Sequence, residues 1–107
     1  LDDKVIYAWN CQAVGALARA SAVLGDRTFL DAALACLAFL DAKLTRASDG
    51  RLLRAWRQAE PGEPDADDIP AFAEDYGAAC LALLDLFDVT SDARHLAAAR
   101  RRLDEAR

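Results

Sequence analysis

The sequence predicts an all-α fold made of two αα-hairpins, and three observations support this prediction. The 107 residues include 25 alanines, and alanine is the best helix former. Apolar residues recur at the spacing of one helix face in four separate segments. The two halves of the chain also repeat one another, because equivalent residues lie 66 positions apart.

The first hairpin is predicted over residues 8–44. Leu17 belongs to an apolar stripe with i, i+3, i+4 spacing, which indicates an amphipathic helix over residues 8–24. Gly25 can end this helix, and Asp26 can cap the start of the next one. A short connection of this kind is typical of two antiparallel helices.

A long loop is predicted over residues 45–70, followed by the second hairpin over residues 71–107. The loop contains a Ser-Asp-Gly turn signal at 48–50 and an acidic, proline-containing stretch at 60–70. Loops of this length are uncommon in compact domains and are often functional. Helical periodicity resumes after the loop and breaks once more near Asp92.

The internal repeat pairs Asp26 with Asp92 and Leu17 with Leu83. A repeated helix pair buries its apolar faces against its neighbours, and three or more copies are normally needed. Two copies therefore predict that further helix pairs surround them in a larger assembly.

Composition excludes several classes of function. The net charge of −5 argues against nucleic-acid binding, which needs a basic face. The chain has neither a run of 18 apolar residues nor a signal peptide, so no membrane association and a cytoplasmic location are expected. The arginines near the end of the chain have Asp104 and Glu105 beside them and are expected on a solvated helix face; they are Arg94, Arg100, Arg101, Arg102 and Arg107.

The three cysteines, Cys11, Cys36 and Cys80, are odd in number and widely spaced. This pattern favours buried thiols over a disulfide framework or a zinc site. No metal and no cofactor are expected.

A ligand site is predicted at one end of the two hairpins. The shift of 66 pairs Trp9 with Asp75 and Asn10 with Tyr76, so these residues begin equivalent helices and should emerge at a common mouth. The long loop and the first residues of the chain run into the same end. The candidate residues are Asp2, Asp3, Lys4, Trp9, Asn10, Arg54, Trp56, Arg57, Glu74, Asp75 and Tyr76.

Indole faces beside carboxylates, an amide and guanidinium groups are typical of a cleft for a polyhydroxylated ligand. Structural roles compete with this interpretation. Glu74 and Asp75 are also expected as first-turn acids that favour the helix dipole. Asn10 could cap a helix and Trp9 could fill the core, so Trp56, in the loop, is the better ligand candidate. His95 is expected on the surface, away from the mouth.

Three separated motifs support a family resemblance, and they are residues 2–5 (DDKV) with 9–10 (WN), residues 49–57 (DGRLLRAWR), and residues 74–76 (EDY) with 83–87 (LLDLF). Together they resemble the helical region of thioredoxin-domain-containing proteins related to spermatogenesis-associated protein 20. The resemblance departs from the family pattern at Cys11, where glycine is usual, and at Gly77, where alanine is usual.

The resemblance implies an (α/α)6 toroid, similar to N-acylglucosamine 2-epimerases and six-hairpin glycosidases, of which this chain would be a fragment of two hairpins. It also implies a preceding thioredoxin-like domain and further toroid hairpins as intramolecular partners. The expected function is binding or processing of a carbohydrate-like small molecule. The alternative is a non-catalytic helical scaffold that presents partners or substrates to the thioredoxin-like domain.

Overall fold

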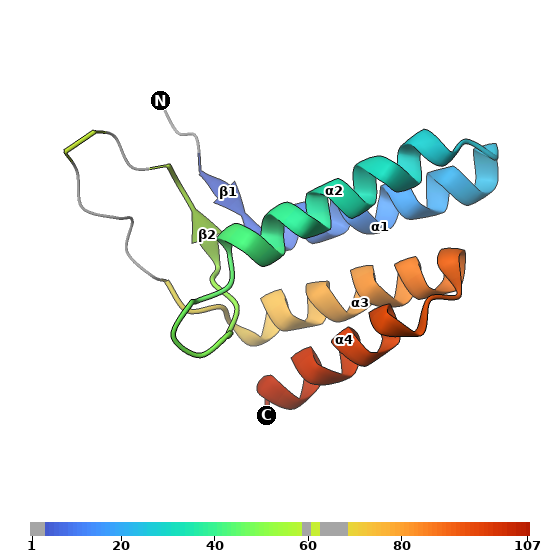
Figure 1. Ribbon diagram of the computed structural model, residues 1–107. Helices are drawn as coiled ribbons and strands as arrows, with labels where there is room; N and C mark the ends of the chain where they lie inside the picture. Colours follow the sequence, from blue (N-terminus) through green and yellow to red (C-terminus); the bar gives the residue numbers. More distant parts are fainter. Residues whose placement is uncertain (1–3, 59–60, 63–68) are drawn as a thin grey trace.

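The computed structural model describes residues 4–58, 61–62 and 69–107, and this part of the chain folds into four helices in two antiparallel pairs (Figure 1). Helix α1 (Tyr7–Leu24) pairs with α2 (Arg27–Lys43), and α3 (Ala73–Thr90) pairs with α4 (Ala93–Glu105). The prediction of an all-α fold with two αα-hairpins is confirmed. Each helix of the second pair begins 66 residues after its counterpart in the first pair.

Aspartate side chains begin the second helix of each pair. The Asp26 carboxylate accepts a hydrogen bond from the Thr28 backbone N–H at 2.9 Å, and Asp92 accepts one from the Arg94 backbone N–H at 3.0 Å. These contacts satisfy donors that have no partner inside the helix. The cap at Asp26 was predicted from the sequence, and Asp92 is its repeat equivalent; the two caps fix where α2 and α4 begin.

The turns that join the paired helices are also equivalent. Gly25 (φ 65°) and Ser91 (φ 58°) both adopt the left-handed conformation, and they are 66 positions apart. Glycine adopts this conformation without a steric penalty, whereas serine does not. The same reversal is therefore made twice with different residues.

Helix α1 lies at the centre of the fold, because it packs against both α2 and α3 (Figure 1). α1 and α3 lie side by side and run in the same direction, away from the segment that joins the two hairpins. Between them, Arg19 of α1 forms an ion pair with Asp85 of α3, its repeat equivalent. The largest fully buried apolar side chains of the core are Leu40, Leu44, Leu52, Leu86 and Val14.

The segment predicted as loop 45–70 contains a short strand. Strand β2 (Ala55–Trp56) pairs antiparallel with β1 (Val5–Ile6), which precedes α1. Two isolated bridges, Thr45 with Leu52 and Leu53 with Pro70, join further parts of this segment to each other. The segment is therefore fixed to the beginnings of α1 and α3 by backbone hydrogen bonds between residues distant in sequence.

Three expectations about exposure need correction. Arg102 was predicted on a solvated helix face, but its side chain is only 12% exposed and bonds to the 45–52 segment. His95 was expected on the open surface but is half-buried. Of the three cysteines, Cys11 is buried as predicted, whereas Cys36 and Cys80 are half-buried.

Candidate ligand pocket at the mouth of the hairpins

A pocket of about 400 Å³ opens where α1 and α3 begin. Trp9 and Gln12, one turn apart, line it from α1, and strand β2 with the residue before it forms another wall. The first turn of α3 completes the pocket. Its lining residues are Lys4, Ile6, Ala8, Trp9, Gln12, Arg54, Ala55, Ile69, Glu74, Asp75 and Ala78.

Trp9 supplies apolar surface to this pocket. It is 67% exposed although it begins a helix whose other face is buried. The competing interpretation, that Trp9 fills the core, does not fit this exposure. An exposed indole that lines a pocket can stack against an apolar ligand face.

Arg54 occupies the centre of the polar wall. Its guanidinium donates hydrogen bonds to Glu74 Oε1 at 2.7 Å and to Asp75 Oδ2 at 3.3 Å. It also lies 4.6 Å from the centroid of the Phe72 ring. The hydrogen bond to Glu74 and the neighbouring Asp75 raise the pKa of Arg54, so this side chain remains a cation.

Asp75 has a structural contact as well as a place in the wall. Its side chain is 1% exposed, and Oδ2 accepts a hydrogen bond of 2.8 Å from the Phe72 backbone N–H. The carboxylate thereby caps α3 from inside its first turn and at the same time holds Arg54. Glu74, whose side chain is 67% exposed, is the carboxylate that can contact a ligand.

Five of the eleven predicted site residues line this pocket: Lys4, Trp9, Arg54, Glu74 and Asp75. Asn10 lies on another face of α1, where its amide donates to Ile6 O at 2.9 Å and its Oδ1 accepts from the Cys36 thiol at 3.7 Å. Tyr76 is buried, and its hydroxyl accepts a hydrogen bond from the Leu52 backbone N–H at 3.2 Å.

Trp56, the tryptophan favoured by sequence as a ligand contact, packs against α2. Its ring meets Phe39 edge to face with centroids 5.5 Å apart, and the Lys43 ammonium lies 5.7 Å from its centroid. The neighbouring Arg57 is half-buried. The candidates Asp2 and Asp3 lie outside the described residues.

Sequence reasoning did not single out Gln12, Ala78 or Ile69. Gln12 follows Trp9 by three residues on the same helix face, and the shift of 66 maps Gln12 onto Ala78. That equivalence was a usable signal, since both residues line the pocket. Ile69 reaches the pocket only through the bridge between Leu53 and Pro70, which local patterns do not predict.

A second pocket continues from the first along the groove between α1 and α3. It shares Gln12, Glu74 and Ala78 with the mouth and extends to Asp85. Gly15 and Gly77 help to line this groove, so small residues keep it open.

In the described residues, no group of three or more histidine, cysteine or acidic side chains is arranged to hold a metal ion. None of the described helices has both the length and the apolarity to cross a bilayer.

Comparison with known proteins supports the resemblance in part. No family model matches the chain. The chain is similar to spermatogenesis-associated protein 20. It is 31% identical to the human protein and 32% identical to the rat protein, each over 98 residues. The match covers 90% of this chain but only 12% of spermatogenesis-associated protein 20. Distant homology therefore extends over nearly the whole chain, which corresponds to a small part of each relative.

Proposed function

We propose that this chain forms one side of a binding site for a carbohydrate-like ligand, at the mouth where α1 and α3 begin. The observation that carries the proposal is the pocket that joins exposed Trp9 to Arg54 and Glu74. An indole face suits the apolar face of a sugar ring, while the polar groups suit its hydroxyls.

Binding is better supported than glycoside chemistry. Acid and base catalysis of that type uses two carboxylates on opposite sides of the scissile bond. Here Glu74 and Asp75 both contact the same guanidinium, and Asp75 is buried under a backbone N–H. Among the described residues that line the pocket, Glu74 and Asp75 are the carboxylates, and they lie on the same wall rather than facing each other across it.

Tryptophan fluorescence provides a sharp test, because the chain has two tryptophans. A Trp56→Phe variant leaves Trp9 as the sole indole, and we expect a saccharide that binds to change its emission saturably. In the matched Trp9→Phe variant, the remaining indole is Trp56, which does not line the pocket. The emission of Trp56 should not change when the saccharide is added. If no member of a broad saccharide panel alters Trp9 emission, the proposal is wrong.

The helix pairs themselves belong, in our proposal, to an (α/α)6 toroid preceded by a thioredoxin-like domain in the longer protein. Support comes from the equivalence of the two pairs and from distant similarity to a much longer protein. Exposed apolar side chains on α3 and α4, such as Leu81 and Leu103, provide surface that neighbouring helices could cover.

These exposed leucines also favour the second candidate, a non-catalytic helical scaffold that presents partners or substrates to the thioredoxin-like domain. Co-purification from cells that express the longer protein, with and without residues 7–105, tests this alternative. A scaffold should lose specific partners when the helices are deleted. Retention of every partner would contradict the alternative, and the saccharide titration is independent of this outcome.

A further inference from the structure

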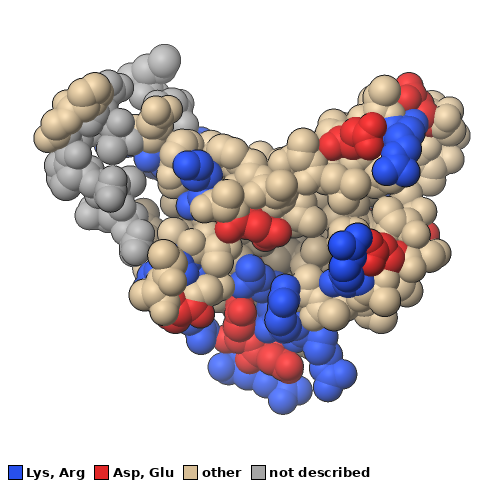
Figure 2. Space-filling model, in the orientation of Figure 1, with Lys and Arg blue, Asp and Glu red and all other residues tan. Residues whose placement is uncertain are grey.

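A separate cleft, of about 350 Å³, lies between α2 and α4. Each of these helices packs against its own partner, α1 or α3, and Tyr7 and Leu83 of those partners help to line the cleft. None of the described residues that line this cleft lines the mouth pocket. Figure 2 shows basic side chains gathered over α4 on this face, with acidic side chains among them.

The cationic wall of the cleft comes from one face of α4. Arg94, Ala98 and Arg101 follow each other at helical spacing, and His95 and Arg102 lie beside them. Ala98 is small, so the middle of this wall is open between longer side chains. The spacing of three or four residues places all five on one side of the helix.

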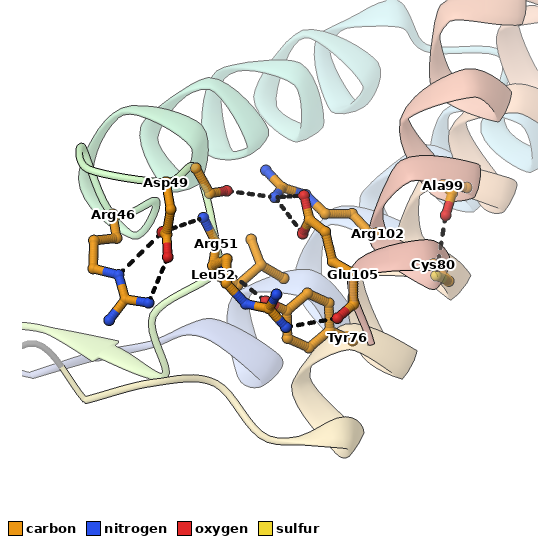
Figure 3. A network of polar contacts seen from close by, with 10 residues as sticks. Arg46, Asp49, Arg51, Leu52, Tyr76, Cys80, Ala99, Arg102 and Glu105 are labelled. Carbon is orange, nitrogen blue, oxygen red and sulfur yellow. Dashed lines mark hydrogen bonds and ion pairs between the residues drawn. The ribbon is translucent and has the colours of Figure 1, made fainter. Parts of the chain in front are cut away.

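Arg102 is fixed in this wall by groups outside the cleft. Its Nη1 donates to Gly50 O at 2.9 Å and to Glu105 Oε2 at 2.9 Å (Figure 3). Arg101, by contrast, is exposed. The wall therefore combines an anchored guanidinium with one that can turn toward a ligand.

Asp41 of α2 lies on the opposite wall. Burial raises the pKa of its carboxyl, and the neighbouring guanidinium groups of Arg102 and Arg101 oppose this rise. An anion placed near Asp41 would be repelled, whereas one placed over Ala98 would meet Arg101 beside Arg94 and Arg102, which are paired with Asp92 and Glu105. The charges thus define one side of the cleft as the place for an anion.

We infer that the cleft between α2 and α4 is a second ligand site, which binds the phosphate group of a small molecule against α4. Guanidinium groups present forked N–H donors that match the oxygens of phosphate. The chain as a whole carries a net charge of −5. Anion binding at this face would therefore depend on the local arginines and not on the overall charge. The inference uses no residue of the mouth pocket, and the two sites can be tested separately.

Calorimetric titration with inorganic phosphate, at constant ionic strength set by chloride, tests the site. We expect saturable binding that Arg101→Gln weakens about 10-fold, since a charge-assisted hydrogen bond contributes roughly this much. Arg100→Gln is the matched control because it removes the same charge from the adjacent residue, outside the lining of the cleft. It should weaken binding less than about 2-fold.

Asp41→Asn gives a second readout with the opposite sign. Removing this charge should tighten phosphate binding by a few fold, on the order expected for two charges several ångströms apart near a surface. A titration with a hexose phosphate distinguishes the source of the phosphate, since a phosphorylated metabolite should bind more tightly than the free ion. Saturation by either form supports the site when Arg101→Gln weakens it, whereas hexose phosphate binding that Arg101→Gln leaves unchanged reports the mouth pocket.

The inference is overturned if neither form of phosphate saturates the wild-type protein. Equal weakening by Arg100→Gln and Arg101→Gln would also overturn it, because the effect would then reflect net charge alone. Should Arg101→Gln lose its helical circular-dichroism signal, Arg101→Lys replaces it, which keeps the charge but removes the forked donors. That variant should still bind several-fold more weakly.

Discussion

At the level of single residues, Asp75 connects the beginning of α3 to the mouth pocket. One buried carboxylate accepts the Phe72 backbone N–H and the Arg54 guanidinium. A backbone N–H at the start of a helix has no partner inside the helix, so loss of its side-chain acceptor costs free energy. The stability of α3 and the position of Arg54 therefore depend on the same side chain.

We expect Asp75→Ala to lower the free energy of unfolding by about 1–3 kcal/mol, because it leaves the Phe72 N–H unpaired. Asp75→Asn should cost less, since its amide oxygen can still accept that hydrogen bond. Glu74→Ala is the control, and the loss of an exposed ion pair should cost at most about 1 kcal/mol. Urea unfolding measures all three, and an equal cost at Glu74 and Asp75 would contradict the assignment.

Cysteine reactivity gives a second prediction at this scale. Burial raises the pKa of Cys11 to about 12, and Cys11 is 2% exposed, whereas Cys36 and Cys80 are half-buried. The thiolate is the reactive form, so Cys11 should be alkylated last. Peptide mapping after timed treatment with iodoacetamide measures the order.

Denaturant supplies the control for this experiment. Cys11 labelling should accelerate through the unfolding transition, because unfolding removes the burial that raises its pKa. Labelling of Cys11 in the folded protein as fast as that of Cys80 would contradict the prediction.

The two tryptophans mark the limit of residue-level prediction from sequence. Trp56 looked like a ligand contact because no helix stripe required it, but pairing of β2 with β1 gives it a packed environment beside Phe39. Trp9 was a ligand candidate with core filling as the alternative, because large aromatic side chains are usually buried; it is exposed and lines the pocket. Each exception arises from contacts between distant segments, which local spacing does not contain.

At the level of elements, the equivalent turns at Gly25 and Ser91 invite an exchange. Both have positive φ, and an added Cβ at Gly25 would meet no heavy atom within 4 Å. Exchanging glycine and serine at these positions should therefore change the free energy of unfolding only through the backbone conformation. This makes the pair a matched test of the left-handed conformation.

We expect Ser91→Gly to raise the free energy of unfolding by about 0.5–1 kcal/mol and Gly25→Ser to lower it by a similar amount. Thermal unfolding of both variants, and of the double variant, measures the effect. The double variant should be close to wild type, because distant changes add. The same sign for both single variants would contradict the explanation.

The helices themselves were the most predictable elements. Apolar periodicity and the caps at Asp26 and Asp92 are local, so sequence reasoning located all four helices and their equivalence. The strand at Ala55–Trp56 was not predicted as a paired element, because its partner lies before α1. Local signals thus determine the helices, while the walls of the pocket depend on tertiary pairing.

At the level of the whole molecule, the contact between α1 and α3 indicates where a third helix pair would pack. Gly15 and Arg19 of α1 lie against Asp85 of α3. On α3, the equivalent of Gly15 is Leu81. Gly15 is buried, whereas Leu81 is 67% exposed, so in the proposed toroid the next repeat would cover Leu81.

We expect Leu81→Gln to change the free energy of unfolding of the 107-residue chain by less than about 0.5 kcal/mol. In the longer protein it should cost about 2 kcal/mol, because the side chain would be buried there. Leu86→Ala is the control, with a cost of about 2–5 kcal/mol in both proteins, since Leu86 is fully buried. A silent Leu81→Gln in the longer protein would contradict the toroid proposal.

The pairing of β1 with β2 has a consequence for folding. Each helix pair consists of neighbours in sequence and is expected to form early, whereas Val5 and Trp56 are distant in sequence and are expected to meet later. Bringing Val5 and Trp56 together closes a large loop and lowers the entropy of the chain, and contacts within one helix pair do not offset this loss. The pocket wall is therefore expected to form last and to open first, with faster amide hydrogen exchange there than in the helix centres.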